Sequence, residues 1–188
     1  MNSLSSDSDS KYKIVCTKNN IILQKDTTKD LAYILSFCTI PSSDMFNKLK
    51  SQNLFFLLAK LNPDIIETID ITHGDETSQN ILLVFKRFGK EFGLPQKSLY
   101  LKTLSCKMDE TMIIVNAESV PYSGSIYNCT NIIAQYANIC IKVVDNHIIV
   151  EYAFNIDLQE DLPSYMKDLP GLLMKKIFMR VKSYIENG

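Results

Sequence analysis

Residues capable of acid–base or metal chemistry are few in this chain, and their spacing does not group them well. His73 and His147 are the only histidines, and each lies in a stretch typical of a turn. Asp70, Asp75 and Glu76 lie close to His73, but a polar cluster within one turn is more typical of a solvated loop than of a metal site. The chain also lacks a GxSxG motif, a glycine-rich phosphate loop and an HExxH helix. The sequence therefore favours a protein that is not an enzyme, and it predicts no metal and no cofactor.

A second group of residues, at positions 86–93, could act on a membrane surface. Aromatic and basic side chains are interleaved there with two glycines, and they are Lys86, Arg87, Phe88, Lys90 and Phe92. Aromatic rings favour the bilayer interface, and cations favour anionic headgroups. The segment is therefore interpreted as a membrane contact. The alternative is a solvated loop whose rings pack under a neighbouring sheet.

Lys102 is a cation that could meet a ligand inside the protein. It lies within residues 98–107, a run typical of a strand. If its side chain points inward it could bind a phosphate or a hydroxyl, because a buried cation needs a polar partner. The outward orientation is also compatible with the pattern, since Leu101 with Thr103 and Tyr100 with Leu104 both make acceptable inner faces.

Length and composition limit the class of protein that these residues can serve. With 188 residues and 46% hydrophobic side chains, the chain is expected to form one domain over residues 12–188, after a disordered polar tail at residues 1–11. The net charge of −1 gives no general attraction to nucleic acid or to membranes. No apolar run approaches the roughly 20 residues of a spanning helix, and no secretory signal is visible. We expect a cytoplasmic protein whose five cysteines are free thiols.

Short strand patterns dominate the chain, and two helical segments interrupt them. Strands are expected at residues 21–24, 31–40, 65–72, 81–85, 98–107, 111–119, 127–135, 139–144 and 148–156. One helix is expected to follow Ser42 or Ser43 and a second to cover residues 53–61. Tight turns are expected at residues 137–138 and 145–146. Short connections between consecutive strands predict an antiparallel meander rather than parallel βαβ units.

The last segment predicts one long helix that begins near residues 161–163. Apolar residues recur along it at steps of three or four, and they are Met166, Leu169, Leu173, Ile177, Val181 and Ile185. Pro170 and Gly171 predict a kink or a break, because proline removes a backbone hydrogen bond. Strands and helix together predict an α+β helix-grip fold, in which a curved antiparallel sheet wraps around the C-terminal helix. One helix fills such a concave face only in part, so bulky side chains or a cavity must occupy the rest.

Five motifs, in order along residues 12–186, resemble those of START (steroidogenic-acute-regulatory-related lipid-transfer) domains. They are Asn20-Ile21-Ile22-Leu23-Gln24-Lys25, residues 35–49, Gly93-Leu94-Pro95 with the strand up to Lys102, Glu118-Ser119-Val120-Pro121-Tyr122, and Asp157-Leu158 with Leu162-Pro163. The third motif departs from the family, because Gln96-Lys97-Ser98 stands where the family has Arg, Asp and an aromatic residue. The resemblance implies a START/Bet v 1-like helix-grip fold with an internal hydrophobic tunnel.

The resemblance also implies a function: non-enzymatic binding of one lipid and its transfer between membranes, with a phospholipid favoured over a sterol or a ceramide. The tunnel residues that it implies are Tyr100, Lys102, Asn116, Glu118, Tyr152, Phe154, Met166, Leu169, Leu173 and Ile177. The implied gate combines the final helix, at Pro170 and Gly171, with the loop at residues 86–93. The expected partners are the lipid and, transiently, a membrane surface, and the protein is expected to be a monomer that does not bind nucleic acid. Two alternatives are a lipid-sensing interaction domain with a collapsed pocket and a helix-grip hydrolase or cyclase.

Overall fold

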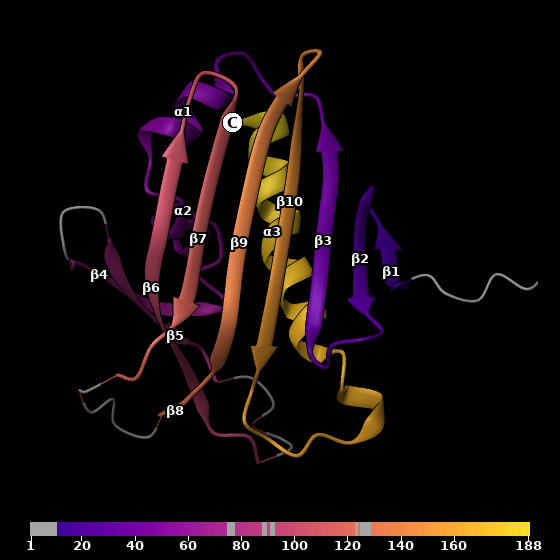
Figure 1. Ribbon diagram of the computed structural model, residues 1–188, viewed down its shortest axis with the longest axis vertical. Helices are drawn as coiled ribbons and strands as arrows, with labels where there is room; N and C mark the ends of the chain where they lie inside the picture. The colour runs from indigo at the N-terminus through magenta and orange to yellow at the C-terminus, as the bar shows by residue number, and fades with distance from the viewer. Residues whose placement is uncertain (1–10, 75–77, 88–89, 91–92, 123, 125–128) are drawn as a thin grey trace, which may run out of the picture.

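One mainly antiparallel sheet forms the frame of the protein (Figure 1). The computed structural model describes residues 11–74, 78–87, 90, 93–122, 124 and 129–188. Within these residues nine strands follow the order β1-β2-β3-β10-β9-β7-β6-β5-β4, and the short β8 pairs in parallel with β6. The strands are β1 (Tyr12–Lys18), β2 (Ile21–Asp26), β3 (Ala32–Thr39), β4 (Ile66–His73), β5 (Gln79–Phe85), β6 (Gln96–Met108), β7 (Met112–Ser119), β8 (Cys129–Asn131), β9 (Ile133–Val144) and β10 (His147–Asp157).

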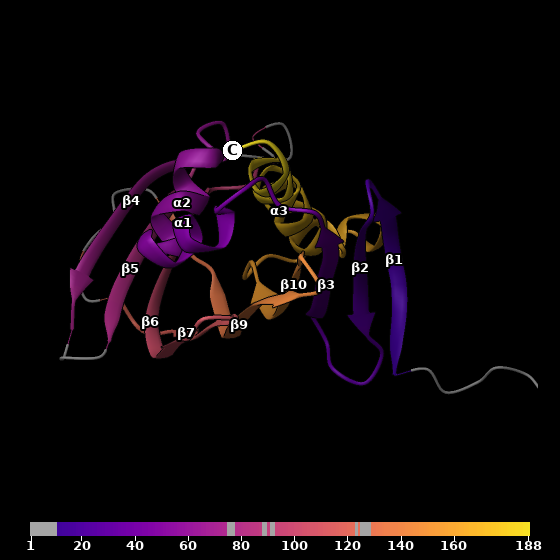
Figure 2. The same ribbon diagram turned by 90° about the horizontal axis from the view of Figure 1, so that it is seen from above.

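The sheet curves around the helices, which lie on its concave side (Figure 2). They are α1 (Met45–Ser51), α2 (Leu54–Leu61) and α3 (Leu169–Asn187), and a 3-10 turn, η2 (Ser164–Met166), precedes α3. None of the helices in the described part of the chain is long and apolar enough to cross a bilayer. The predicted arrangement, a curved antiparallel sheet around a long C-terminal helix, is confirmed.

Alternation of buried and exposed residues decides which face of each strand meets the helices. On β10 the buried residues include Tyr152 and Phe154, and Phe178 of α3 packs on Tyr152. Tyr152 lies opposite Ile139 of β9, which in turn lies opposite Val115 of β7. These residues therefore mark the concave face on three adjacent strands.

Of the two tight turns expected between strands, one forms and the other does not. Asp145 and Asn146 both adopt positive φ values, 47° and 61°, in the tight turn between β9 and β10, a conformation that Asn and Asp tolerate. The turn expected at residues 137–138 does not form, because β9 runs without interruption through both positions. A continuous β9 can pair with β7 and β10 over most of its length.

Helix α3 begins later than the sequence pattern indicated. Its first residue is Leu169, not a residue near 161–163, and η2 lies separately before it. Pro170 therefore sits in the first turn, where its missing N–H had no helical partner to lose. Gly171 permits a close approach to the sheet, since a Cβ there would lie 2.8 Å from Cε1 of Tyr33. The kink or break expected at Pro170 and Gly171 does not form, because both residues lie in the first turn of a continuous α3.

Candidate functional site

A stack of aromatic rings fills the interior beneath α3. The ring centroids of Tyr33 and Phe154 are 5.5 Å apart, those of Phe154 and Tyr152 are 4.5 Å apart, and those of Tyr152 and Phe178 are 4.9 Å apart. All four side chains are buried. Burial raises the pKa of the Tyr152 hydroxyl, so that this group stays neutral. The centre of the concave face is thus occupied by side chains.

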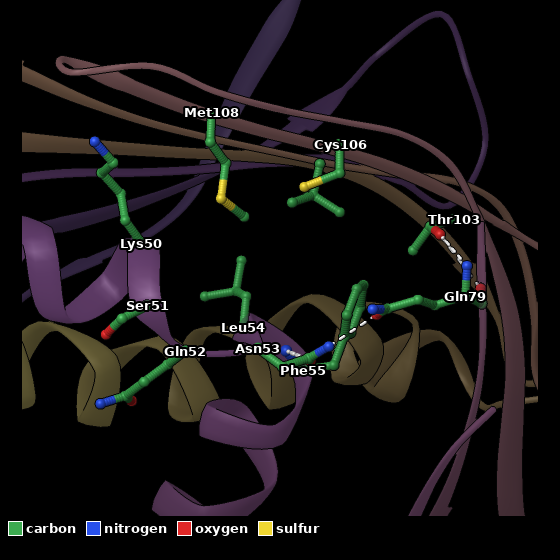
Figure 3. A pocket seen from close by; sticks show the side chains of 11 residues that line it. Lys50, Ser51, Gln52, Asn53, Leu54, Phe55, Gln79, Thr103, Cys106 and Met108 are labelled. Carbon is green, nitrogen blue, oxygen red and sulfur yellow. Dashed lines mark hydrogen bonds between the residues drawn. The ribbon is translucent and has the colours of Figure 1, made fainter. Parts of the chain in front are cut away.

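A cavity of about 300 Å³ remains beside the stack, between the α1–α2 junction and strands β5, β6 and β7. It is lined by Lys50, Ser51, Gln52, Asn53, Leu54, Phe55, Gln79, Thr103, Cys106, Met108 and Val115. Figure 3 shows Cys106 and Met108 on the sheet side and Leu54 on the helix side. Val115 and Tyr152 both flank Ile139, so one residue separates the cavity from the ring stack.

A bulge in β6 turns the residues of the cavity wall inward. Thr103 lies opposite Ala117, but the register shifts before Ser105, and Cys106 then lies opposite the buried Val115. In an unbroken alternation Thr103 and Ser105 would share a face, and Cys106 would point away from the helices. Partial burial raises the pKa of the Cys106 thiol.

The inner end of the cavity is polar and hydrogen-bonded. Asn53 caps α2, because its Oδ1 accepts hydrogen bonds from the backbone N–H groups of Phe55 and Phe56 at 3.0 and 3.2 Å. Its Nδ2 donates to Oε1 of Gln79 at 2.8 Å. The backbone N–H of Gln79 donates to Oγ1 of Thr103 at 2.7 Å. These bonds fix the start of α2 to β5 and β6 and keep the cavity wall in place.

The other end of the cavity carries a cation. Lys50, at the end of α1, is half-buried, and its Nζ lies 5.9 Å from the centre of the Phe46 ring. Asp109, in the turn after β6, lies near enough for Lys50 to help lower the pKa of its carboxyl, although the hydrogen bond from the backbone of Thr111 contributes most. The cavity therefore has an apolar middle, a neutral polar inner end and one charged end.

Four of the predicted tunnel residues lie on the outer face of the sheet. Leu101, Thr103, Val115 and Ala117 are buried toward the helices, so the intervening residues point the other way, and these are Tyr100, Lys102, Asn116 and Glu118. Lys102 lies opposite Glu118. Asn116 donates from Nδ2 to Oγ of Ser105 at 2.8 Å, and Tyr100 packs edge-on against Tyr122 at 4.8 Å. The outward orientation of Lys102 is the one that the structure has.

The other predicted tunnel residues lie on the helix side, but they do not line the cavity. Tyr152 and Phe154 belong to the ring stack, and Ile177 is buried on α3. Leu169 and Leu173 are half-buried on the same helix, and Met166 lies before it on η2. The cavity walls come instead from α1, α2, β5, β6 and β7, and the sequence pattern did not single out these residues as a site.

The predicted gate is only partly covered by the described residues. Phe88 and Phe92 lie outside them, while Lys86, Arg87 and Lys90 are exposed. Arg87 donates from Nε to the carbonyl oxygen of Leu94 at 3.1 Å. Pro170 and Gly171 are buried at the start of α3, where Tyr165 and Leu172 nearby expose 78% and 43% of their surface.

Lys97 is a buried cation that sequence reasoning missed. Its side chain is completely buried, and Nζ donates to Oγ1 of Thr130 at 2.7 Å, to the carbonyl oxygen of Leu158 at 2.8 Å and to Oε1 of Glu160 at 2.5 Å. Three acceptors satisfy the three N–H bonds of the ammonium group. Lys97 thereby ties β6 to the segment that connects β10 with α3. The available signal was its place in the motif at residues 93–102, where the family pattern was assigned to Lys102 instead.

Ion pairs hold α3 to the rest of the fold at its middle and just before its start. Arg180 pairs with Asp64, which also accepts from Lys176 at 3.4 Å, and Nη1 of Arg180 donates to the buried Asn62 at 3.2 Å. The hydrogen bond from Arg180 lowers the pKa of the Asp64 carboxyl. Before the helix, Asp168 pairs with Lys25 at 3.1 Å. Any outward movement of α3 must break some of these contacts.

Comparison of the whole architecture with solved structures identifies the fold. The lipid transfer and protein localization domain of human StarD13 (DLC2) superposes with a TM-score of 0.72 at 12% identity, over 94% of this chain and 90% of that one. Human StAR-related lipid transfer protein 5 gives 0.74 at 12% identity, over 95% and 88%. The chain has the START-like helix-grip fold.

Two further solved structures, one of them an enzyme, have folds similar to that of this chain. The STAR-related lipid transfer protein from Xanthomonas axonopodis gives a TM-score of 0.67 at 12% identity, over 94% of this chain and 97% of that one. The aromatase/cyclase Zhui from Streptomyces sp. R1128 gives 0.51 at 8% identity, over 82% and 90%. Comparison of the sequence with family models and with curated proteins finds no match. At these identities the likeness establishes the fold and leaves the function to be argued from the cavity.

Proposed function

We propose that this protein binds one amphipathic lipid, without chemical turnover, in the cavity between the α1–α2 junction and strands β5–β7. One observation carries this proposal: the cavity combines an apolar wall, formed by Leu54, Phe55 and Val115, with Lys50 at one end. Burial of apolar surface there would supply the affinity, at about 25 cal/mol per Å². Lys50 would orient an anionic or hydroxylated end toward solvent.

The volume of the cavity bears on which lipid fits. One water molecule has a share of about 30 Å³ in the liquid, and a methylene group is similar in size. A cavity of about 300 Å³ therefore holds about ten such groups, whereas the two chains of a phospholipid contain roughly 30. We therefore favour a lipid with a single chain for the closed form. A phospholipid would require more space than the cavity has.

Displacement of the ring stack would provide that space. Only Ile139 separates Val115 in the cavity wall from Tyr152 in the stack, and Phe178 moves with α3 if the helix moves. We propose that α3 and the loop at residues 86–93 act as the gate for exchange with a membrane. The exposed Tyr165 and Leu172, beside the start of α3, support this place of contact.

A second candidate function rests on the same stack. Because four rings fill the centre of the concave face, the protein could act as an interaction domain with a largely collapsed pocket. The two candidates differ in one measurable property: only the first requires a molecule in the cavity.

Mass spectrometry of the organic extract of purified protein tests the proposed function directly. A lipid should be recovered from the wild type, and its recovery should fall about tenfold in Cys106→Trp, because an indole ring would fill the cavity. The matched control is Cys38→Trp, since Cys38 is an exposed cysteine like Cys106 but lies on β3 and does not line the cavity. If neither extraction nor incubation with single-chain lipids or phospholipid vesicles loads the wild type, the lipid proposal is refuted and the interaction domain is favoured.

A further inference from the structure

A buried lysine of α3 meets a cysteine of the edge strand β1. Lys175 exposes only 4% of its surface, and its Nζ lies 3.0 Å from Sγ of Cys16. Among the residues that the structure describes, this sulfur is the one hydrogen-bond acceptor of Nζ. A buried ammonium group normally has oxygen acceptors around it, as Lys97 has. The pairing of an amine with a single thiol is therefore a reactive arrangement rather than a typical structural one.

A bulge in β1 creates this contact. The register between β1 and β2 shifts between Ile14 and Cys16, which brings Cys16 opposite the buried Leu23. Cys16 therefore faces α3, while Ile14 is 59% exposed. Cys16 itself is only half-buried, so a small oxidant can reach the sulfur while the amine stays enclosed.

We propose that oxidation of Cys16 joins it covalently to Lys175 through a sulfur–nitrogen bond. In the first step a peroxide oxidises the thiol to a sulfenate: the peroxide O–O bond breaks, an S–O bond forms, and one water and one proton are released. In the second step the sulfenate oxygen takes one proton from the ammonium group of Lys175, and the free amine then attacks the sulfur. The N–S bond forms, the S–O bond breaks, and the oxygen leaves as water after it takes a second proton from the nitrogen. The product is a sulfenamide, and external thiols reduce it back to the free thiol and amine.

The position of Lys175 favours this product over further oxidation. A sulfenic acid is normally captured by a nearby thiol or nitrogen, and otherwise proceeds to sulfinic acid. Here the nitrogen is already within 3.0 Å of the sulfur, and it competes at high effective concentration with any solvent-borne reactant. The two residues are 159 positions apart in the sequence, so the bond would cross-link the first strand to the last helix.

The cross-link would regulate the exchange of the bound ligand, and this consequence rests on the proposed function. Ligand exchange is proposed to require movement of α3, and a bond from β1 to the middle of α3 would restrain that movement. Oxidising conditions would then hold the ligand in place, and reduction would release it. The chemical step itself does not depend on a ligand.

Peptide mapping of the full-length protein tests the cross-link. Wild-type protein is treated with hydrogen peroxide and digested without reductant. The expected product is the Cys16 peptide joined to the Lys175 peptide, with a mass equal to their sum less two hydrogen atoms. Dithiothreitol should restore both separate peptides, and Cys16→Ser should lose the joined product entirely. Cys38→Ser should retain it, because Cys38 lies exposed on another strand.

Peptide mapping of the wild-type protein alone can refute the proposal, so the test does not depend on whether a variant folds. Cys16 found as a sulfinic acid or as a mixed disulfide, with Lys175 in its ordinary unlinked peptide, would refute it. The functional consequence has a separate readout: the rate at which a fluorescent single-chain fatty acid leaves the protein before and after peroxide. A cross-linked protein that binds no fatty acid would contradict the proposed function and leave the cross-link established.

Discussion

Nζ of Lys97 lies 2.5 Å from Oε1 of Glu160, and the lysine side chain has no exposed surface, whereas the glutamate is 24% exposed. The pair joins β6 to the connection that leads into α3. Since Leu158 in the same connection accepts a further bond from Lys97, one side chain fixes the beginning of this connection to the sheet at two points.

Replacement of Lys97 by Met should destabilise the protein by about 3 kcal/mol, because it leaves the acceptors on Thr130, Leu158 and Glu160 without their donor. Urea denaturation measures the free energy of unfolding. Lys142→Met is the control, since Lys142 is an exposed strand lysine, and its effect should stay within about 0.5 kcal/mol. Equal effects of the two substitutions would show that the buried cation has no structural role.

Gly171→Ala should destabilise the fold even though alanine favours helices. The added Cβ would lie 2.8 Å from Cε1 of Tyr33, a buried ring that cannot turn aside. The expected cost of such overpacking is about 1–3 kcal/mol, against a helix-propensity gain of at most about 1 kcal/mol. Thermal unfolding of this variant should therefore occur at a lower temperature than that of the wild type. Leu172→Ala, at the adjacent exposed position, should change little.

Phe178→Ala should weaken the protein and enlarge its interior at the same time. Removal of a buried ring from the stack is expected to cost about 3–5 kcal/mol. If the proposed lipid site is correct, longer acyl chains should also appear in the organic extract, because space opens beside the cavity. The matched control is Phe56→Ala on α2, where the ring is 58% exposed. If folded Phe178→Ala protein yields lipids with the same acyl-chain lengths as the wild type, the ring stack does not limit the size of the lipid site.

The ion pair between Asp64 and Arg180 should make stability depend on pH in the acid range. The hydrogen bond from Arg180 lowers the pKa of Asp64 in the folded state, so the pair stabilises the fold above the unfolded pKa of about 3.9. This contribution is lost as the pH falls below that value. Asp64→Asn should unfold at a lower temperature than the wild type at neutral pH, and the gap should close in acid. Asp70→Asn, at an exposed position on β4, should show no such convergence.

The sequence contained enough information for the sheet and for the resemblance to START domains, but not for the direction of Lys102. Both faces of β6 carry apolar residues, so alternation alone could not choose between them. Lys102 points outward because its neighbours Leu101 and Thr103 are buried toward the helices. Beyond Thr103 a bulge changes the alternation again. A bulge has no reliable pattern in a single sequence.

Long-range contacts explain why other parts of the site could not be predicted. The partners of Lys97 lie 33, 61 and 63 positions away, and no local pattern distinguishes it from an exposed strand lysine. The start of α3 was placed too early because Leu162-Pro163 and Pro170 both suit a first turn. The contacts of Asp168 and Gly171 with Tyr33, at the observed start, join residues that are far apart in the sequence. The cavity depends on how side chains from five elements leave a space, which composition does not encode.

The bulge in β6 has a consequence for how such an interior can change in size. Leu104 is the extra residue, and it is 55% exposed. If it were deleted, Thr103 and Cys106 would both keep their inward direction, but the strand would lose the local bend that a bulge adds. The volume of the interior therefore depends partly on the number of residues in β6. An insertion or deletion at a solvent-exposed position could widen or flatten the binding space without replacing any residue that touches the ligand.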